Sequence, residues 1–136
     1  MNFNFLEEKF GIELPGFYKE SILDYPFEVV DDLDFVEDNL VRKLDWVLKN
    51  NTQLRNEGFF GQRWPDHYFS IGHDGFGNYV FISLKDNDMK IYFVDHEFEY
   101  DLANMEELEY AASMKEYISI CKEDQLDILG DDAKNI

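Results

Sequence analysis

The strongest constraint in this sequence is its charge: 30 Asp and Glu residues oppose 12 Lys and Arg residues, which gives a formal net charge of −18 over 136 residues. Because repulsion on this scale destabilises any compact state, folding requires a substantial apolar core. The sequence supplies one, since 45% of its residues are hydrophobic and 17% are aromatic, whereas disordered acidic chains are poor in aromatic residues. The length fits one domain, and no repeat, linker or low-complexity block divides it. We therefore expect a single domain over residues 1–136.

The same charge argues against two classes of partner. Binding of nucleic acid through its phosphates needs clustered Lys and Arg, and an anionic membrane surface would repel this chain. No apolar run approaches the roughly 20 residues of a membrane-spanning helix, and the N-terminus lacks a signal-peptide pattern. The single cysteine, Cys121, forms no internal disulfide, which fits a reducing compartment. We expect a cytoplasmic protein that contacts neither nucleic acid nor membranes directly.

Helical periodicity predicts four helices. The first covers about residues 3–10, and Pro15 suits the first turn of the second, where its missing N–H would be unpaired in any case. A longer pattern predicts a third helix over about 37–55. The last helix is predicted to begin at Ser113, because Ser113 and Glu116 form an S-x-x-E capping box.

Runs of β-branched and aromatic residues predict strands, beginning with a short one at about 27–30. Three more follow over 68–71, 79–84 and 91–94. Their connections are short and rich in turn residues, so these three strands should pair as an antiparallel meander. Residues 98–102 alternate strictly between apolar and acidic side chains, which predicts another strand with its apolar side facing inward.

No motif in the sequence carries recognisable catalytic or cofactor chemistry. Gly72, Gly75 and Gly77 do not follow the G-x-G-x-x-G spacing and join two strands instead of opening a phosphate-binding helix, so a tight hairpin is favoured. Cys121 lies on the apolar face of the last predicted helix and is interpreted as a buried hydrophobic residue. Carboxylates are so abundant that no pair stands out as an acid–base couple. We therefore predict that the protein is not an enzyme and holds no cofactor.

The three histidines are the remaining candidates for metal ligands. His73 precedes Asp74 and His96 precedes Glu97, and an imidazole beside a carboxylate suits several metals. Neither pair has the H-x-x-x-H or H-E-x-x-H spacing. All three histidines, including His67, fall at predicted loops or strand ends, where solvent satisfies the ring. The prediction is no metal site, and a hydrolase or metal enzyme built on the His73 and His96 region is kept as an alternative.

Two acidic segments without Lys or Arg, residues 28–38 and 95–109, carry the remaining functional signal. A charged segment is most often a solvated surface that keeps a protein soluble, but charges fixed along a sheet also steer a basic partner and speed its association. The sequence leaves both interpretations open. On the second, acidic residues combine with aromatic anchors, which interface hot spots favour. The candidate contact residues are Asp74, Asp95, Glu97, Glu99 and Asp101, with Phe76, Tyr100 and Trp64.

Four motifs occur in an order that resembles the SUKH superfamily, which is named for fungal cell-wall assembly regulators and bacterial immunity proteins. Residues 6–19, LEEKFGIELPxxYK, resemble its N-terminal signature. Residues 68–79, YFSIGHDGFGNY, are similar to its central hairpin, and residues 91–97, IYFVDHE, to its next strand. Residues 111–118, AASMKEYI, resemble its closing helix. Each motif is short, but together they span nearly the whole chain in the expected order.

The resemblance implies an α+β fold, with a twisted, mainly antiparallel sheet and helices packed against it, and a binding protein without catalytic residues. The chain departs from the family pattern at Tyr25-Pro26, where many members have an Asn-Gly turn, and residues 28–55 match only in general character. Most bacterial members are immunity proteins that neutralise a polymorphic or contact-dependent toxin, frequently a nuclease, whereas the fungal branch acts as a regulatory scaffold.

Length, single-domain build and acidity favour the immunity branch for this chain. Nuclease toxins carry basic clefts for their substrate, and a partner of net charge −18 suits such a cleft electrostatically. The expected function is therefore an immunity protein that binds a basic toxin domain and blocks it by occlusion. A regulatory scaffold or general protein-interaction module is the alternative, and the sequence leaves the oligomeric state open.

Overall fold

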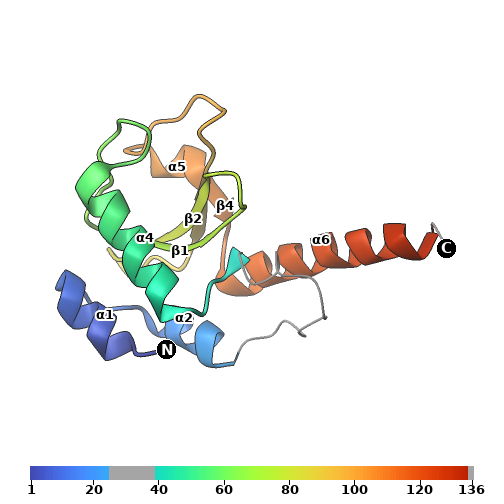
Figure 1. Cartoon of the computed structure of the whole chain (residues 1–136), viewed down its shortest axis with the longest axis horizontal. Helices are drawn as coiled ribbons and strands as arrows, with labels where there is room; N and C mark the ends of the chain where they lie inside the picture. Colours follow the sequence, from blue (N-terminus) through green and yellow to red (C-terminus); the bar gives the residue numbers. More distant parts are fainter. Residues whose placement is uncertain (25–38, 135–136) are drawn as a thin grey trace.

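A computed structural model of the protein describes residues 1–24 and 39–134 and, within these, side chains up to residue 124 (Figure 1). The fold is α+β: one antiparallel sheet, in the order β1-β2-β3-β4, has helices packed against it. The strands are β1 (Tyr68–His73), β2 (Tyr79–Ser83), β3 (Ile91–Val94) and β4 (Glu109–Ala111). The helices are α1 (Phe3–Phe10), α2 (Gly16–Leu23), α4 (Leu44–Glu57), α5 (Met105–Leu108) and α6 (Met114–Lys134).

The two N-terminal helices form as predicted and are joined through one carboxylate. Gly11 ends α1 in the left-handed region, at φ +64°, which glycine adopts without strain. Glu7 then accepts a hydrogen bond from the Leu14 N–H at 2.9 Å and pairs with Lys19 Nζ at 3.3 Å. Because Lys19 lies on α2, Glu7 holds α1 against α2.

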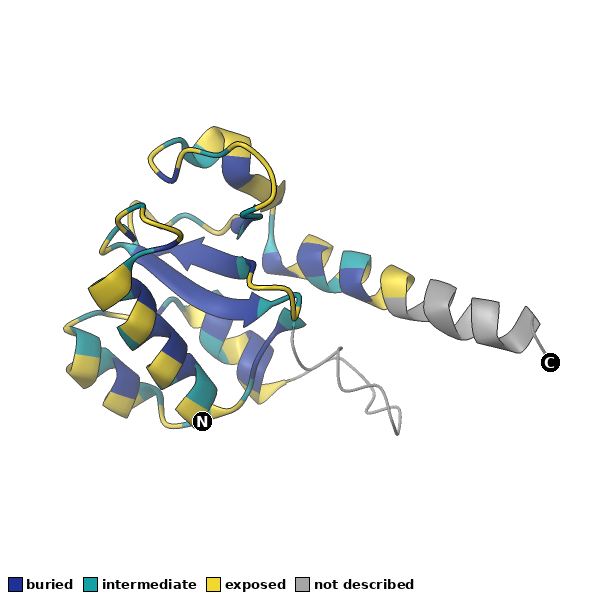
Figure 2. Ribbon diagram, turned by 45° about the horizontal axis from the view of Figure 1, so that its top comes forward, coloured by how far each residue is buried: buried dark blue, intermediate teal, exposed yellow. Residues whose placement is uncertain are grey.

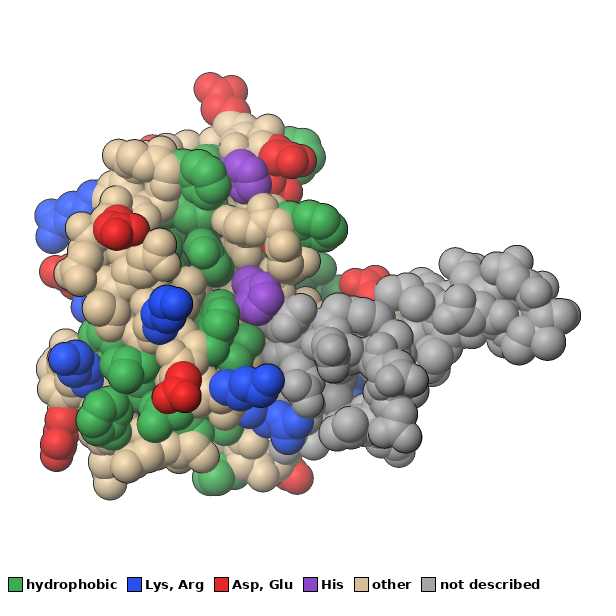
Figure 3. All heavy atoms as spheres, viewed as in Figure 1, with side chains coloured by type: hydrophobic (Ala, Val, Ile, Leu, Met, Phe, Trp, Pro, Cys, Tyr) green, Lys and Arg blue, Asp and Glu red, His purple; other side chains and the backbone are tan. Residues whose placement is uncertain are grey.

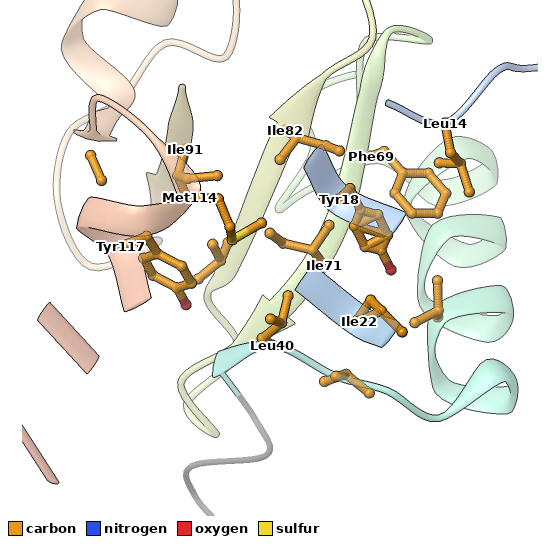
Figure 4. Packing of buried hydrophobic residues seen from close by; sticks show 14 of the residues in the cluster. Leu14, Tyr18, Ile22, Leu40, Phe69, Ile71, Ile82, Ile91, Met114 and Tyr117 are labelled. Carbon is orange, nitrogen blue, oxygen red and sulfur yellow. The ribbon is translucent and has the colours of Figure 1, made fainter. Parts of the chain in front are cut away.

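One face of the sheet packs against α1, α2 and α6 to form the larger of two apolar clusters. Alternate residues of a strand point to the same face, so Phe69, Ile71 and Ile82 share this cluster with Tyr18 of α2. At its other side, Ile91 lies near Met114 and Tyr117 of α6 (Figure 4). The rings of Phe69 and Tyr18 lie edge to face, with centroids 5.8 Å apart. The strands are accordingly the most completely buried part of the described chain (Figure 2).

The opposite face carries a ladder of aromatic rings, with Tyr68, Phe81 and Tyr92 on three neighbouring strands. Trp64 covers this ladder and is only 1% exposed, and its Nε1–H donates to the Tyr68 carbonyl at 3.2 Å. The prediction of Trp64 as an accessible anchor is therefore wrong. The Trp64 ring packs against Phe59 as well as the ladder, so it fills the core instead of facing a partner.

Helix α4 lies beside β1 and supplies hydrogen-bond partners for backbone groups at the outer edge of that strand. The fully buried Asn51 accepts from the Ser70 N–H at 2.7 Å and donates to the Ser70 carbonyl at 2.9 Å. The Val41 N–H donates to the Ile71 carbonyl at 2.9 Å, so the chain at Val41 lies against the strand. This pairing explains why α4 begins at Leu44 and not near residue 37, as the periodicity predicts.

The predicted strand over residues 98–102 is wrong, because this segment is a loop. β4 occupies the free edge of β3 through the pairs Ile91–Ala111 and Tyr92–Glu109. The loop backbone is held instead by the Gln62 side chain, which accepts from the Leu102 N–H at 3.2 Å and donates to the Tyr100 carbonyl at 3.3 Å. Leu102 is buried as its apolar character suggests, but Phe98 is 71% exposed.

The capping box at the start of α6 is confirmed. The Glu116 N–H donates to Ser113 Oγ at 3.1 Å, and the Glu116 carboxylate accepts from the Ala112 N–H at 3.1 Å. Cys121 is buried on the inner side of this helix, and burial raises the pKa of its thiol to about 11. The predicted strand at 27–30 and the acidic segment 28–38 lie outside the described residues.

Candidate partner-binding surface

Three loops meet at the end of the sheet where β1 ends, β2 begins and β3 ends. They are the turn 74–78, the loop 95–101 that leaves β3, and residues 58–61 after α4. A Cβ placed on Gly77 would lie 3.7 Å from the His96 ring and 3.9 Å from the Phe60 ring, so the three loops are in close contact. We call these three segments the sheet-end surface. Figure 3 shows histidine and hydrophobic side chains gathered on the face of the molecule that carries α4.

A chain of hydrogen bonds through the buried Asn78 fixes two of these loops to each other. Asp74 accepts from the Phe76 and Asn78 N–H groups, at 2.8 and 3.3 Å, and from Asn78 Nδ2 at 2.7 Å. Asn78 Oδ1 in turn accepts from the His96 N–H at 2.9 Å and lies 2.6 Å from His96 Nδ1. Since an amide oxygen only accepts, His96 Nδ1 carries a hydrogen in this arrangement. Asp74 therefore shapes the turn that presents its neighbour Phe76.

Large aromatic side chains project from each of the three loops. Phe60, Phe76 and Phe98 are 64%, 78% and 71% exposed. Phe60 stacks on His96 with ring centroids 4.4 Å apart and 7° between the planes, and it adopts φ +45°, which is uncommon for a bulky residue. Phe60 is not among the residues predicted from the sequence, although the flanking glycines, Gly58 and Gly61, mark a tight turn.

The carboxylates on this surface fall into two groups. Asp95 and Asp101 cap their own turns, since each accepts from the N–H two residues later, at 2.9 Å. Glu97 and Glu99 are exposed, and neither has an ion-pair partner among the described residues. No described ion pair thus compensates the charge of these two side chains.

Tyr100 has a supporting position in the surface. It is half-buried, its hydroxyl donates to the Phe59 carbonyl at 3.3 Å, and its ring lies 5.3 Å from that of Phe59. Burial raises the pKa of this phenol above its ordinary value. Of the sequence-predicted residues, the structure brings Asp74, Phe76, Asp95 and Glu97 to the end of the sheet. Glu99, Tyr100 and Asp101 continue along the same loop, and only Trp64 is fully buried.

The histidines at this end of the sheet pack against aromatic rings. His73 stacks on Trp46 at 4.9 Å, in the same way that His96 stacks on Phe60. Within residues 1–24 and 39–134, no three His, Cys, Asp or Glu side chains come together as a metal site would require. In the same ranges, no helix is long and apolar enough to cross a membrane.

Comparison with protein-family models decides the affiliation of the chain. The model of the SMI1/KNR4 family (SUKH-1) matches residues 2–120, which include the sheet and all three loops of the sheet-end surface. The chain belongs to the SMI1/KNR4 family. Searches of curated proteins and of solved structures found no match. SUKH domains are generally non-catalytic proteins of the immunity type, so membership in this family is consistent with an immunity role and suggests a protein as partner.

Proposed function

We propose that this SMI1/KNR4-family protein is a cytoplasmic immunity protein that binds a cognate toxin domain, a basic nuclease, and blocks it by occlusion. The observation that supports this best is the sheet-end surface. There, exposed aromatic rings and uncompensated carboxylates lie on loops that hydrogen bonds hold in one arrangement. Since a pre-ordered surface loses little entropy on association, more of its contact energy remains as affinity.

The aromatic rings are proposed to supply the anchors. Hot spots of protein interfaces are rich in aromatic side chains that fill pockets of the partner. Phe76 is the most exposed of the large hydrophobic side chains described, at 78%, and it stands at the tip of the turn that Asp74 fixes. An exposed phenylalanine at this position contributes nothing to the core, which is why binding is the function we assign to it.

The acidic residues are proposed to act mainly on the rate of association. Glu97 and Glu99 add negative charge beside the anchors, and a basic cleft would be drawn to them over about a Debye length, roughly 8–10 Å at physiological salt. Their effect should weaken as salt rises. This assigns the acidic segment a role in binding in addition to solubility.

The test is co-expression of the protein with the toxin domain encoded beside its gene, scored for survival and for a stable complex. The variant Glu97→Lys/Glu99→Lys changes the formal net charge from −18 to −14. It should slow association about tenfold or more at low salt and flatten its salt dependence. A matched control, Glu8→Lys/Glu20→Lys, makes the same change on exposed positions of α1 and α2 and should bind nearly as the unmodified protein does.

Equal effects of the two double variants would show that total charge matters and the sheet-end surface does not. The second candidate function is a regulatory scaffold of the cell-wall-regulator type, which the family also includes. It predicts no rescue from any neighbouring toxin and stable complexes with endogenous proteins instead.

A further inference from the structure

The turn after α4 holds a bulky residue in a backbone conformation that suits small ones. Phe59 and Gln62 exchange both backbone hydrogen bonds, at 2.8 and 3.0 Å, so Phe60 and Gly61 are the two central residues of a tight turn. Both have positive φ, +45° and +85°. Turns of this kind prefer Asn, Asp or Gly at the first central position, and a phenylalanine there is strained. The fold therefore holds Phe60 in this place at an energetic cost.

Burial in the core does not account for this placement. Phe60 is 64% exposed, whereas the adjacent Phe59 is 2% exposed and belongs to the core. Backbone strain that a fold maintains is typical of residues that act in binding or catalysis. We therefore interpret the accessible ring of Phe60 as a contact residue of the sheet-end surface.

Phe60 and His96 together form a flat shelf. Their rings lie nearly parallel, with centroids 4.4 Å apart and 7° between the planes. His96 covers one side of the Phe60 ring, and the exposure of Phe60 leaves the rest of the ring accessible. Asn78 Oδ1 holds the imidazole in place, since it accepts from the His96 N–H at 2.9 Å and lies 2.6 Å from Nδ1. The shelf is thus formed before any partner binds.

The polar groups around the shelf favour a cation. Glu97 follows His96 directly, and Glu99 lies two residues further; both are exposed and neither forms an ion pair within the described residues. Because Nδ1 of His96 carries a hydrogen toward Asn78, Nε2 of the neutral ring is an acceptor, and it has no hydrogen bond to any described residue. The face of an aromatic ring is also negative. None of the three loops contains Lys or Arg.

Among cationic side chains, arginine fits this arrangement best. Its guanidinium is planar and stacks on aromatic faces, whereas the ammonium of lysine is a compact, strongly hydrated charge. The guanidinium also pairs with a carboxylate through two parallel hydrogen bonds. An apolar side chain on the shelf would take the carboxylates of Glu97 and Glu99 out of water without pairing them, which is unfavourable.

We propose that Phe60, His96 and Glu97 form a binding site for an arginine side chain of the protein partner, with its guanidinium stacked on Phe60 and paired to Glu97. The proposal deepens the function proposed above and rests on it, since a basic partner supplies the arginine. It separates the roles of two exposed rings. Phe76 enters an apolar pocket of the partner, whereas Phe60 receives a charged side chain.

The probes are two fluorescein-labelled peptides, hexa-arginine and hexa-lysine, whose binding is measured by fluorescence anisotropy at physiological salt. Both carry the same charge, so general attraction to the acidic protein is common to them. Hexa-arginine should bind about threefold more tightly or better, as a cation–π contact at an exposed site predicts. The affinity ratio should fall about twofold or more in Phe60→Leu and persist in the control Phe5→Leu, which alters an exposed ring of α1. Glu97→Gln should weaken hexa-arginine binding more than Glu8→Gln on α1 does.

Thermal unfolding is the second measurement and tests the strain. Phe60→Ala and Phe60→Gly both remove the ring, but only glycine adopts positive φ without strain. Phe60→Gly should therefore unfold at a higher temperature than Phe60→Ala, and it should lose the preference for hexa-arginine as Phe60→Leu does.

Four results would each overturn the proposal. They are equal affinity of the unmodified protein for the two peptides, an undiminished ratio in Phe60→Leu and Phe60→Gly, equal effects of Glu97→Gln and Glu8→Gln, and a higher unfolding temperature for Phe60→Ala than for Phe60→Gly. None of these measurements involves a toxin, so their failure is distinguishable from a failed rescue in co-expression.

Discussion

Replacement of Asn78 by Ala should destabilise the sheet-end surface, because the hydrogen bonds of this one side chain join two of its loops. Asn78 is 3% exposed and takes part in three hydrogen bonds, to Asp74 at 2.7 Å and to the His96 N–H and Nδ1 at 2.9 and 2.6 Å. A neutral hydrogen bond contributes about 1 kcal/mol net, and one to a charged group about 1.5–3 kcal/mol. Two neutral bonds and one to the Asp74 carboxylate therefore predict a loss of roughly 3–5 kcal/mol.

Urea denaturation monitored by tryptophan fluorescence and far-UV circular dichroism measures this loss as a shift in midpoint at constant slope. Asn78→Asp tests the bond to Asp74 separately from the bonds to His96. It keeps an acceptor for His96 but places a second carboxylate against Asp74. It should also destabilise the protein, and the defect should be relieved by Asp74→Asn. Asn56→Ala, an exposed change on α4, should stay within about 0.5 kcal/mol of the unmodified protein. A loss below about 1 kcal/mol for Asn78→Ala would refute the reasoning.

Further predictions concern the core and the N-terminal helices. Trp64→Ala should cost about 3–5 kcal/mol in urea denaturation because it empties a fully buried site, whereas Phe76→Ala should change stability by less than about 0.5 kcal/mol. The Leu14 N–H, and secondarily Lys19, lower the pKa of Glu7. This carboxylate therefore stabilises the fold above its unfolded pKa of about 4.3, and the contribution is lost as pH falls through the lower folded value. Glu7→Gln should be less stable than the unmodified protein at pH 7, and thermal unfolding should show the difference shrinking below about pH 4.

Elements with local determinants were predictable from the sequence. The Ser113–Glu116 box and Gly11 set helix ends within a few residues of chain, and both behave as their patterns predict. The three strands of the hairpin region also follow from short apolar runs with turns between them. The closeness of Asp74 and Phe76 follows from the sequence for the same reason, since both lie in the 74–78 turn.

The errors have non-local causes. Alternation over residues 98–102 is compatible with a strand, but Gln62, which lies far away in the sequence, binds the backbone of this segment. The sequence places Trp64 in a loop, which predicts an exposed ring. In the structure, this ring instead packs on the ladder of Tyr68, Phe81 and Tyr92.

The central claim is that the sheet-end surface contacts the partner. Hydrogen–deuterium exchange of the protein, free and in complex with the toxin domain proposed as its partner, tests it most directly. The account predicts slower exchange on binding at residues 74–78 and 95–101, with α1 and α2 unchanged. Protection confined to α1 and α2, with 74–78 and 95–101 exchanging as in the free protein, would contradict it.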